Sequence, residues 1–260
     1  MLNIAKTICL FLFCSLAAQK TLTFDTFRLE TSKDLFVDDY GNIYLYQNKD
    51  FSFIKFDSLG KKQAKLMLTL PFRIQSVQNP LNIPSFSENA QELKFFDQNL
   101  NEIQTLNFRQ KFGFISAAYV EDLQQAWVLD ESTKRLIQYN FRDDRAVHSF
   151  TMKINFENIR DFLVFEKKVY ILYDDHLLVY NFKSVKILEF ATQDARKLRR
   201  ENNEILIISK STIRKIEQQT LKTIFTAENS QIVDKNSATY FVIKENKLYL
   251  YPIEKEVEIK

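Results

Sequence analysis

The chain has 260 residues, of which 36 are Lys or Arg and 33 are Asp or Glu, so its formal net charge is +3. A charge so close to balance gives no reason to expect a nucleic acid partner. The length suits one large β domain or two smaller ones, because barrels and sandwiches often reach about 200 to 250 residues in one piece.

The N-terminus has the layout of a secretory signal peptide. Lys6 supplies the positive charge, an apolar run covers residues 8–13, and small residues dominate 15–18. We expect residues 1–18 to be removed, which leaves 19–260 as a single exported domain. Both cysteines, Cys9 and Cys14, lie in this leader, so the mature chain would form no disulfide; the alternative is that Cys14 carries a lipid. No later apolar stretch reaches the roughly 18 residues that cross a bilayer.

From residue 20 onward, apolar residues recur with a period of two in short runs rich in Ile, Tyr and Phe, which predicts strands. A similar strand returns along the chain in steps of 40, 43, 43, 36 and 34 residues. A step of about 40 residues that holds about four strands is typical of a propeller blade. The centres of these marker strands are Tyr44, Pro84, Trp127, Tyr170, Leu206 and Tyr240.

After each marker strand the chain makes a polar turn and a third strand, and four of these third strands end in Asp or Asn. Short Asp and Asn side chains bond to the backbone that follows them, so they start tight turns where glycine is scarce. The chain contains only Gly41, Gly60 and Gly113. The four strand ends are Phe56-Asp57, Phe96-Asp97, Tyr139-Asn140 and Tyr180-Asn181.

The repeats predict an all-β fold, a six-bladed β-propeller whose blades cover residues 33–260. The segment 21–29 alternates as a spare strand, and we expect it to complete the C-terminal blade and so remove the last exposed sheet edge. The tail 256–259 is an alternative occupant of that position. Two other arrangements stay open: a seven-bladed ring, if residues 22–35 begin their own blade, and an unclosed sandwich of similar strands.

The reactive residues form no pattern that identifies a reaction. His148 and His176 are the only histidines, and His176 follows two acids, but zinc needs three or four converging ligands. Three scattered glycines cannot form a G-x-S-x-G elbow or a phosphate-binding loop. The acid pairs at 38–39 and 143–144 are of the type that a glycosidase uses, although adjacent acids in a turn face different directions. We therefore predict no catalytic, cofactor-binding or metal-binding residue.

Two groups of residues are candidates for contact with a protein partner. The run 195–200 is the strongest charge feature and falls on the innermost strand of the fifth blade, where it would form a basic patch at the channel mouth. The alternative is that these cations balance the nearby Asp161, Asp174 and Asp194. Aromatic residues at strand ends would be exposed enough to anchor a partner. The partner-binding candidates are Phe72, Phe112, Phe114, Arg196, Lys197, Arg199 and Arg200.

The segments 79–83, 95–103, 126–130 and 169–174 resemble a group of secreted β-propeller proteins from the gliding bacteria that use type 9 secretion. Pro84 and Ser85 depart from the aliphatic strand that the group has there. The group includes the plug subunit of the type 9 outer-membrane translocon. The resemblance therefore implies a periplasmic propeller that is attached to the outer membrane through a β-barrel protein partner, and we expect the propeller itself to be monomeric.

The function that these observations favour is a non-enzymatic module for protein interaction, with a plug or scaffold role in protein export. The alternative is a hydrolase or lyase that acts on glycans outside the cytoplasm, or a propeller that binds carbohydrate at the cell surface. Propellers often hold such sites where their loops converge.

Overall fold

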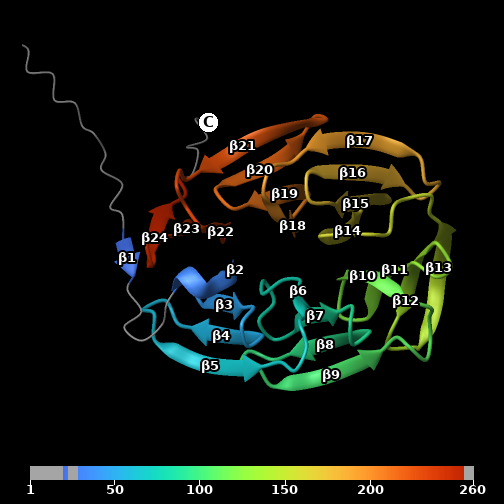
Figure 1. Cartoon of the computed structure of the whole chain (residues 1–260), viewed down its shortest axis with the longest axis horizontal. Helices are drawn as coiled ribbons and strands as arrows, with labels where there is room; N and C mark the ends of the chain where they lie inside the picture. The colour runs from blue at the N-terminus through green and yellow to red at the C-terminus, as the bar shows by residue number, and fades with distance from the viewer. Residues whose placement is uncertain (1–19, 23–28, 255–260) are drawn as a thin grey trace, which may run out of the picture.

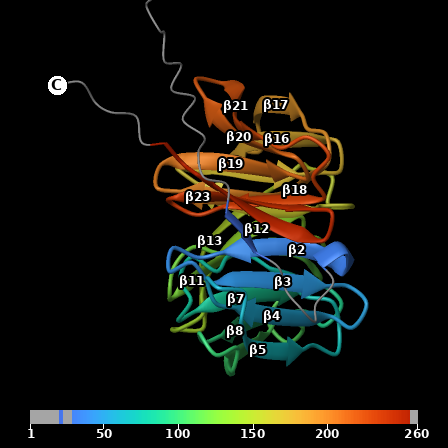
Figure 2. The same ribbon diagram turned by 90° about the vertical axis from the view of Figure 1, so that its left-hand side faces the viewer.

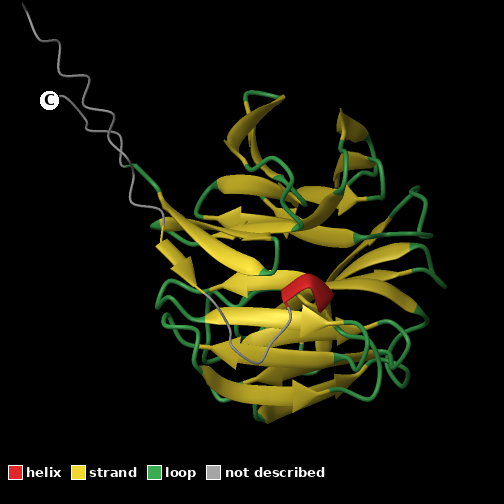
Figure 3. Cartoon of the chain, turned by 60° about the vertical axis from the view of Figure 1, so that its left-hand side comes forward, coloured by secondary structure: helices red, strands yellow, loops and turns green. Residues whose placement is uncertain are grey.

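The computed structural model describes residues 20–22 and 29–254, which form six four-stranded antiparallel sheets arranged as blades around a central axis (Figure 1). Figure 2 shows the ring from the side on which the last blade adjoins the first. The one helix of the described part is the short 3-10 helix η1 (Leu29–Thr31), red in Figure 3. No helix among these residues is long and apolar enough to cross a membrane.

The strands of each blade follow one another from the axis outward. Blades one to three consist of β2 (Ser32–Val37), β3 (Ile43–Gln47), β4 (Ser52–Phe56), β5 (Lys62–Met67); β6 (Arg73–Ile74), β7 (Ile83–Ser87), β8 (Glu92–Phe96), β9 (Glu102–Asn107); and β10 (Ile115–Val120), β11 (Gln125–Asp130), β12 (Arg135–Asn140), β13 (Arg145–Thr151). Blades four to six consist of β14 (Asp161–Phe165), β15 (Lys168–Leu172), β16 (His176–Asn181), β17 (Lys186–Ala191); β18 (Ala195–Glu201), β19 (Glu204–Ser209), β20 (Thr212–Glu217), β21 (Thr220–Thr226); and β22 (Ile232–Lys235), β23 (Thr239–Lys244), β24 (Lys247–Pro252), with β1 (Lys20–Leu22) outermost.

The prediction of a six-bladed all-β propeller is confirmed, and so is its closure by the N-terminal strand. β1 pairs antiparallel with β24, so that Lys20 lies opposite Leu250 and Leu22 opposite Leu248. The seven-bladed arrangement is wrong because Leu22 belongs to blade six while β2 already starts blade one. The sandwich is wrong for the same topological reason. The leader 1–18, the rest of the spare strand at 23–28 and the tail 256–259 lie outside the described residues.

The core lies between the blades, because each sheet is covered on both faces by its neighbours. Every residue of β4 is buried, whereas the outer strand β5 alternates between exposed and half-buried positions. Tyr44 and Phe53 stack in this core with ring centroids 5.6 Å apart, and Phe36 meets Phe53 edge to face at 6.2 Å. Middle strands that are buried on both faces therefore read as continuous apolar runs, and outer strands read as alternating ones.

The predicted Asp and Asn turns are present at all four strand ends. The Oδ1 atom of Asp57 accepts bonds from the N–H groups of Leu59 and Lys61, both at 2.9 Å. The same pattern recurs at Asp97 and Asn181, and Asn140 accepts bonds from the second and third residues after it. Many hairpin residues other than glycine have positive φ, among them Lys134 at 56° and Asn202 at 52°. The turns thus form with few glycines, as the composition required.

Pro84 does not prevent the second marker strand. β7 is fully buried and pairs with β8 over its whole length. On its other side the N–H of Gln75 donates to the oxygen of Pro84 at 3.0 Å, but proline has no N–H to return the bond. The innermost strand β6 accordingly has two residues, Arg73 and Ile74.

Two glutamine side chains connect blade two to blade three. The amide of Gln91 accepts from the N–H of Ile115 at 2.7 Å and donates to its oxygen at 2.8 Å. The amide of Gln75 accepts from the N–H of Val120 at 2.9 Å and donates to the oxygen of Ala118. Each amide therefore substitutes for a peptide group beside the free edge of β10.

Candidate functional site

The central channel holds one cavity at each face of the ring. We call the face where the innermost strands begin the start face, and the opposite one, which carries the turns between first and second and between third and fourth strands, the exit face. The start-face cavity has a volume of about 670 Å³ and the exit-face cavity about 500 Å³. Asp161, the first residue of β14, lines both.

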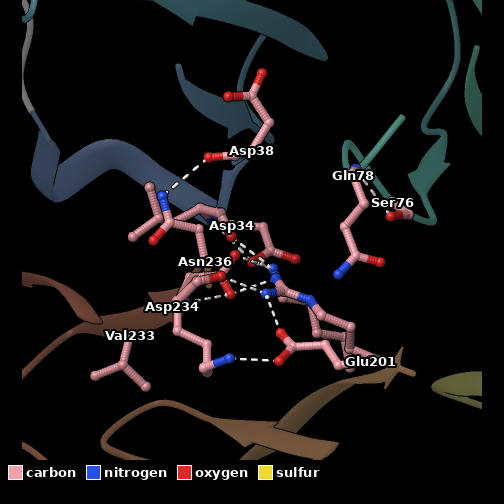
Figure 4. Close-up of polar contacts among 12 residues, drawn as sticks. Asp34, Asp38, Ser76, Gln78, Glu201, Val233, Asp234 and Asn236 are labelled. Atoms are coloured by element: carbon pink, nitrogen blue, oxygen red, sulfur yellow. Dashed lines mark hydrogen bonds and ion pairs between the residues drawn. The ribbon is translucent and has the colours of Figure 1, made fainter. Parts of the chain in front are cut away.

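Three of the four cations of β18, Arg196, Lys197 and Arg199, belong to a largely buried ion network that joins blades five, six and one (Figure 4). The Nζ atom of Lys197 lies 3.1 Å from Asp234 Oδ2 and 3.3 Å from Asp34 Oδ1. Arg196 pairs with Asp34, and Arg199 pairs with Asp234. The members of this interblade network are Asp34, Arg196, Lys197, Arg199, Glu201, Asp234 and Lys235.

The network pairs four cations with three acids, so each of its charges has at least one partner of opposite sign. Burial by itself would raise the pKa of Asp34, but the charges of Arg196 and Lys197 outweigh it and hold that pKa below its usual value. Burial lowers the pKa of Lys197, which Asp234 and Asp34 oppose. Lys197 also lies 3.6 Å from the ring centroid of Phe36, a cation–π contact. These cations are therefore satisfied within the fold.

This arrangement corrects the sequence interpretation of the run 195–200. Lys197 and Arg199 are buried, because neighbouring blades supply acids that draw them inward. Balancing acids are indeed present, but they are Asp34, Asp234 and Glu201, whereas Asp174 pairs with Arg160 and Asp194 with Lys210. Arg200 is more exposed and stacks over Phe165 at 4.1 Å.

The aromatic candidates differ in exposure. Phe72 is buried, contrary to expectation, because it turns into the wall of the start-face cavity just before β6. Phe112 is half-buried and packs edge to face on Tyr139 at 5.2 Å. Phe114 is 42% exposed and lies at the start face, in the loop that leads to β10. Among the three, only Phe114 offers an open aromatic surface.

Neither histidine and no member of the two acid pairs lines either cavity. His176 stacks on Tyr173, with ring centroids 4.7 Å apart, and its Nδ1 atom lies 2.5 Å from Asp175. Asp38 is buried and accepts a bond from the hydroxyl of Tyr44 at 3.0 Å. Asp144 contacts both Lys111 and Tyr139. Within 20–22 and 29–254, no three His, Cys, Asp or Glu residues converge as a metal site.

Arg73 and Asp161 are channel residues that the sequence interpretation did not select as a site. Asp161 accepts bonds from the N–H groups of Phe162 at 2.9 Å and Leu198 at 2.7 Å. Burial raises the pKa of Asp161, and it lowers that of Arg73. The sequence did contain a signal, which is the recurrence of an Asp on the innermost strand of three blades, at Asp34, Asp161 and Asp234. In the structure each of these Asp side chains accepts a bond from the N–H of the next residue.

The exit face carries an apolar arc over blades one to three. Seven of the ten large hydrophobic residues that are exposed in the described part lie at or beside exit-face turns. Five of them lie on blades one to three and are between 53% and 78% exposed, and the other two, Val185 and Ile187, lie on blade four. This apolar arc consists of Tyr40, Leu59, Leu81, Ile103 and Leu123.

No protein-family model and no curated protein match the chain. Among solved structures it is similar to virginiamycin B lyase from Staphylococcus aureus, with a TM-score of 0.54, 9% identity, and coverage of 91% of this chain and 99% of that one. A streptogramin B lyase has a TM-score of 0.52 and 9% identity, with coverage of 90% of this chain and 97% of that one. BamB from Moraxella catarrhalis has a TM-score of 0.44 and 9% identity, with coverage of 86% of this chain and 83% of that one. The likeness to the lyases shows the fold alone.

Proposed function

We propose that the protein is a non-enzymatic interaction module that docks a protein partner on the exit face of blades one to three. The observation that carries this proposal is the apolar arc. Scattered apolar side chains on a surface are ordinary, but exposed ones gathered on one face, with polar residues between them, are characteristic of a protein interface.

The charges around the arc indicate the chemistry of the partner. The exit-face turns of these blades also carry acids, and hydrogen bonds from the turn backbone help to keep the pKa values of Asp57 and Asp97 below the usual range. Asp39 and Asp122 are exposed beside Tyr40 and Leu123. Apolar anchors among carboxylates complement a basic partner surface that has its own apolar residues.

The finer proposal is that this partner is an outer-membrane β-barrel translocon, met in the periplasm, with the propeller in a plug or scaffold role. The leader at 1–18 and the resemblance to exported propellers of type 9 secreting bacteria support it. A rigid disc without projecting domains in its described part suits the closure of a pore. Enzymatic activity is no part of this proposal.

The test is site-specific cross-linking in the native envelope. A photo-reactive residue at position 59 or 123 of the arc should give a cross-linked product with a barrel subunit. The matched control places the same residue at Met67 or Leu70, which are exposed at the start face. Equal cross-linking from both faces would contradict the assigned surface, and a product without any barrel protein would contradict the translocon.

The glycan-acting alternative depends on carboxylates in the start-face cavity, where Glu88 and Asp161 lie. Burial raises the pKa of both. A glycosidase needs environments that shift the pKa values of two carboxyl groups in opposite directions, so that one group is protonated and the other is ionised. Asp34, the lining carboxylate whose pKa is lowered, is already paired with Arg196 and Lys197. The two carboxyl groups without an ion pair are shifted in the same direction, which favours the binding module. Turnover of a glycan that is lost in the Asp161→Asn variant would reverse this preference.

A further inference from the structure

The start-face cavity contains two kinds of charged residues. At its rim Arg160 pairs with Asp174 at 2.6 Å, and Lys210 pairs with Asp194 at 3.2 Å. The half-buried Arg73 and Asp161 and the exposed Lys33 and Glu88 also line the cavity, and they have no ion-pair partner within 4 Å among the described residues. Opposite charges thus share one cavity without contact.

Backbone contacts fix the positions of Arg73 and Asp161. The Nη2 atom of Arg73 donates to the oxygen of Ile159 at 2.9 Å, the sole bond of its guanidinium among described residues, although the group has five N–H donors. Both oxygens of Asp161 are fixed by the N–H groups of Phe162 and Leu198. Arg73 thus reaches from blade two to the oxygen of Ile159, two residues before Asp161, and the other N–H donors of its guanidinium are available to a ligand.

Burial acts against both charges. It lowers the pKa of Arg73, and the nearby charges of Asp161 and Glu88 oppose that change. It raises the pKa of Asp161, which the charge of Arg73 opposes. Each group would be stabilised by a counter-charge in direct contact. A molecule that carries both signs would supply the two missing contacts at once.

We propose that this cavity binds a small zwitterion, an α-amino acid or short peptide, whose carboxylate is bound by Arg73 and whose ammonium group is bound by Asp161 and Glu88. A guanidinium binds a carboxylate through two parallel hydrogen bonds. The cavity volume of about 670 Å³ is within the usual range for small-molecule sites. The cavity is also lined by Asn48, Asn89 and Asn158, whose amides match the peptide groups of a longer ligand.

The first test uses the ligand rather than the protein. Calorimetric titration of the full chain with dialanine should show binding. N-acetyl-dialanine lacks the ammonium group and dialanine amide lacks the carboxylate, so each should bind roughly 10- to 100-fold more weakly, the effect expected for one charge-assisted contact. Equal binding of the capped forms, or no binding of dialanine and trialanine at millimolar concentration, would overturn the proposal.

The second test uses variants. Arg73→Gln should remove the preference for a free carboxylate, and Asp161→Asn the preference for a free ammonium group. Lys210→Gln is the matched control, because it removes an exposed rim charge of the same cavity and should leave both preferences unchanged. If Arg73→Gln and Asp161→Asn retain both preferences, the assignment is wrong, and it is equally wrong if Lys210→Gln abolishes them.

This site is independent of the proposed docking surface, which lies on the other face. A variant with Leu59→Ser and Leu123→Ser should lose the partner and bind dialanine as the parent does. Arg73→Gln should lose dialanine and keep the partner. Failure of either property alone therefore identifies which of the two proposals is wrong.

Discussion

The contacts between blades differ strongly around the ring. Blades five, six and one are joined by the interblade network, in which Asp234 is fully buried between Lys197 and Arg199. Blades two and three are joined by the neutral amides of Gln75 and Gln91. Both devices satisfy buried polar groups. They differ in what remains after one partner is removed: an uncompensated buried charge in the first case, and unpaired peptide groups in the second.

Removal of the acid at the centre of the network should have the largest effect. Asp234→Leu leaves the buried Lys197 and Arg199 without their shared counter-charge, so we expect a loss of about 3–5 kcal/mol in the free energy of unfolding. Chemical denaturation measures it. Asp194→Asn, which removes one member of an exposed pair, is the control. A change below about 1 kcal/mol in the free energy of unfolding of Asp234→Leu would show that the network does not stabilise the contacts among blades five, six and one.

The amide contacts of Gln75 and Gln91 between blades two and three should contribute less to stability than the network. Gln91→Leu keeps the side-chain volume nearly constant but leaves the N–H and oxygen of Ile115 without their partner, at a cost of roughly 1–3 kcal/mol. Because no charge is involved, the difference from the parent should be the same at pH 4 and pH 8. Denaturation curves at both values check this, and a pH-dependent difference would point to a hidden charged partner.

Acid should weaken the interblade network and leave the amide contacts of Gln75 and Gln91 unchanged. The pKa of Asp34 is lower in the folded chain than in the unfolded one, so its stabilising contribution is complete above the unfolded value, about 3.9, and is lost as the pH falls through the folded value. Parent and Asp34→Asn should differ in stability at neutral pH, and the difference should shrink as the pH falls below about 4. A difference at pH 2 that is as large as the one at neutral pH would exclude ionisation as its cause.

The smallest effect is expected at the periphery. Lys186 and Glu189 form an ion pair on the outer strand β17, where both are exposed. Water and salt screen such a pair, so Lys186→Gln should unfold at the same denaturant concentration as the parent. A clear loss of stability would show that burial is not what distinguishes the network.

The architecture could be predicted because its signal is repeated. Alternating strands, a step of about 40 residues and Asp or Asn at strand ends recur in blade after blade, so one irregular member such as Pro84 does not obscure the pattern. Local rules also explain how Pro84 is accommodated, since it shortens β6 and leaves β7 intact.

The sites were less predictable, because they depend on contacts between distant blades. The run 195–200 was visible as charge, but its pairing with Asp34 and Asp234 joins residues separated by as many as 163 positions. Arg73 is a single cation in a short strand. The residues around it in the sequence do not show that it bonds to the backbone of Ile159 or that the charge of Asp161 acts on it. Depth of burial is a property of the assembled ring.

The outermost strand of blade six comes from the opposite end of the chain from its three companions, so the two described ends lie on adjoining strands, with Lys20 across from Leu250. A circularly permuted gene that links these ends and opens a hairpin elsewhere would make blade six contiguous in sequence. Such a protein should keep the same disc, since covalent order is then the one thing altered. Its refolding rate relative to that of the parent would show whether the pairing of β1 with β24 limits the rate of folding.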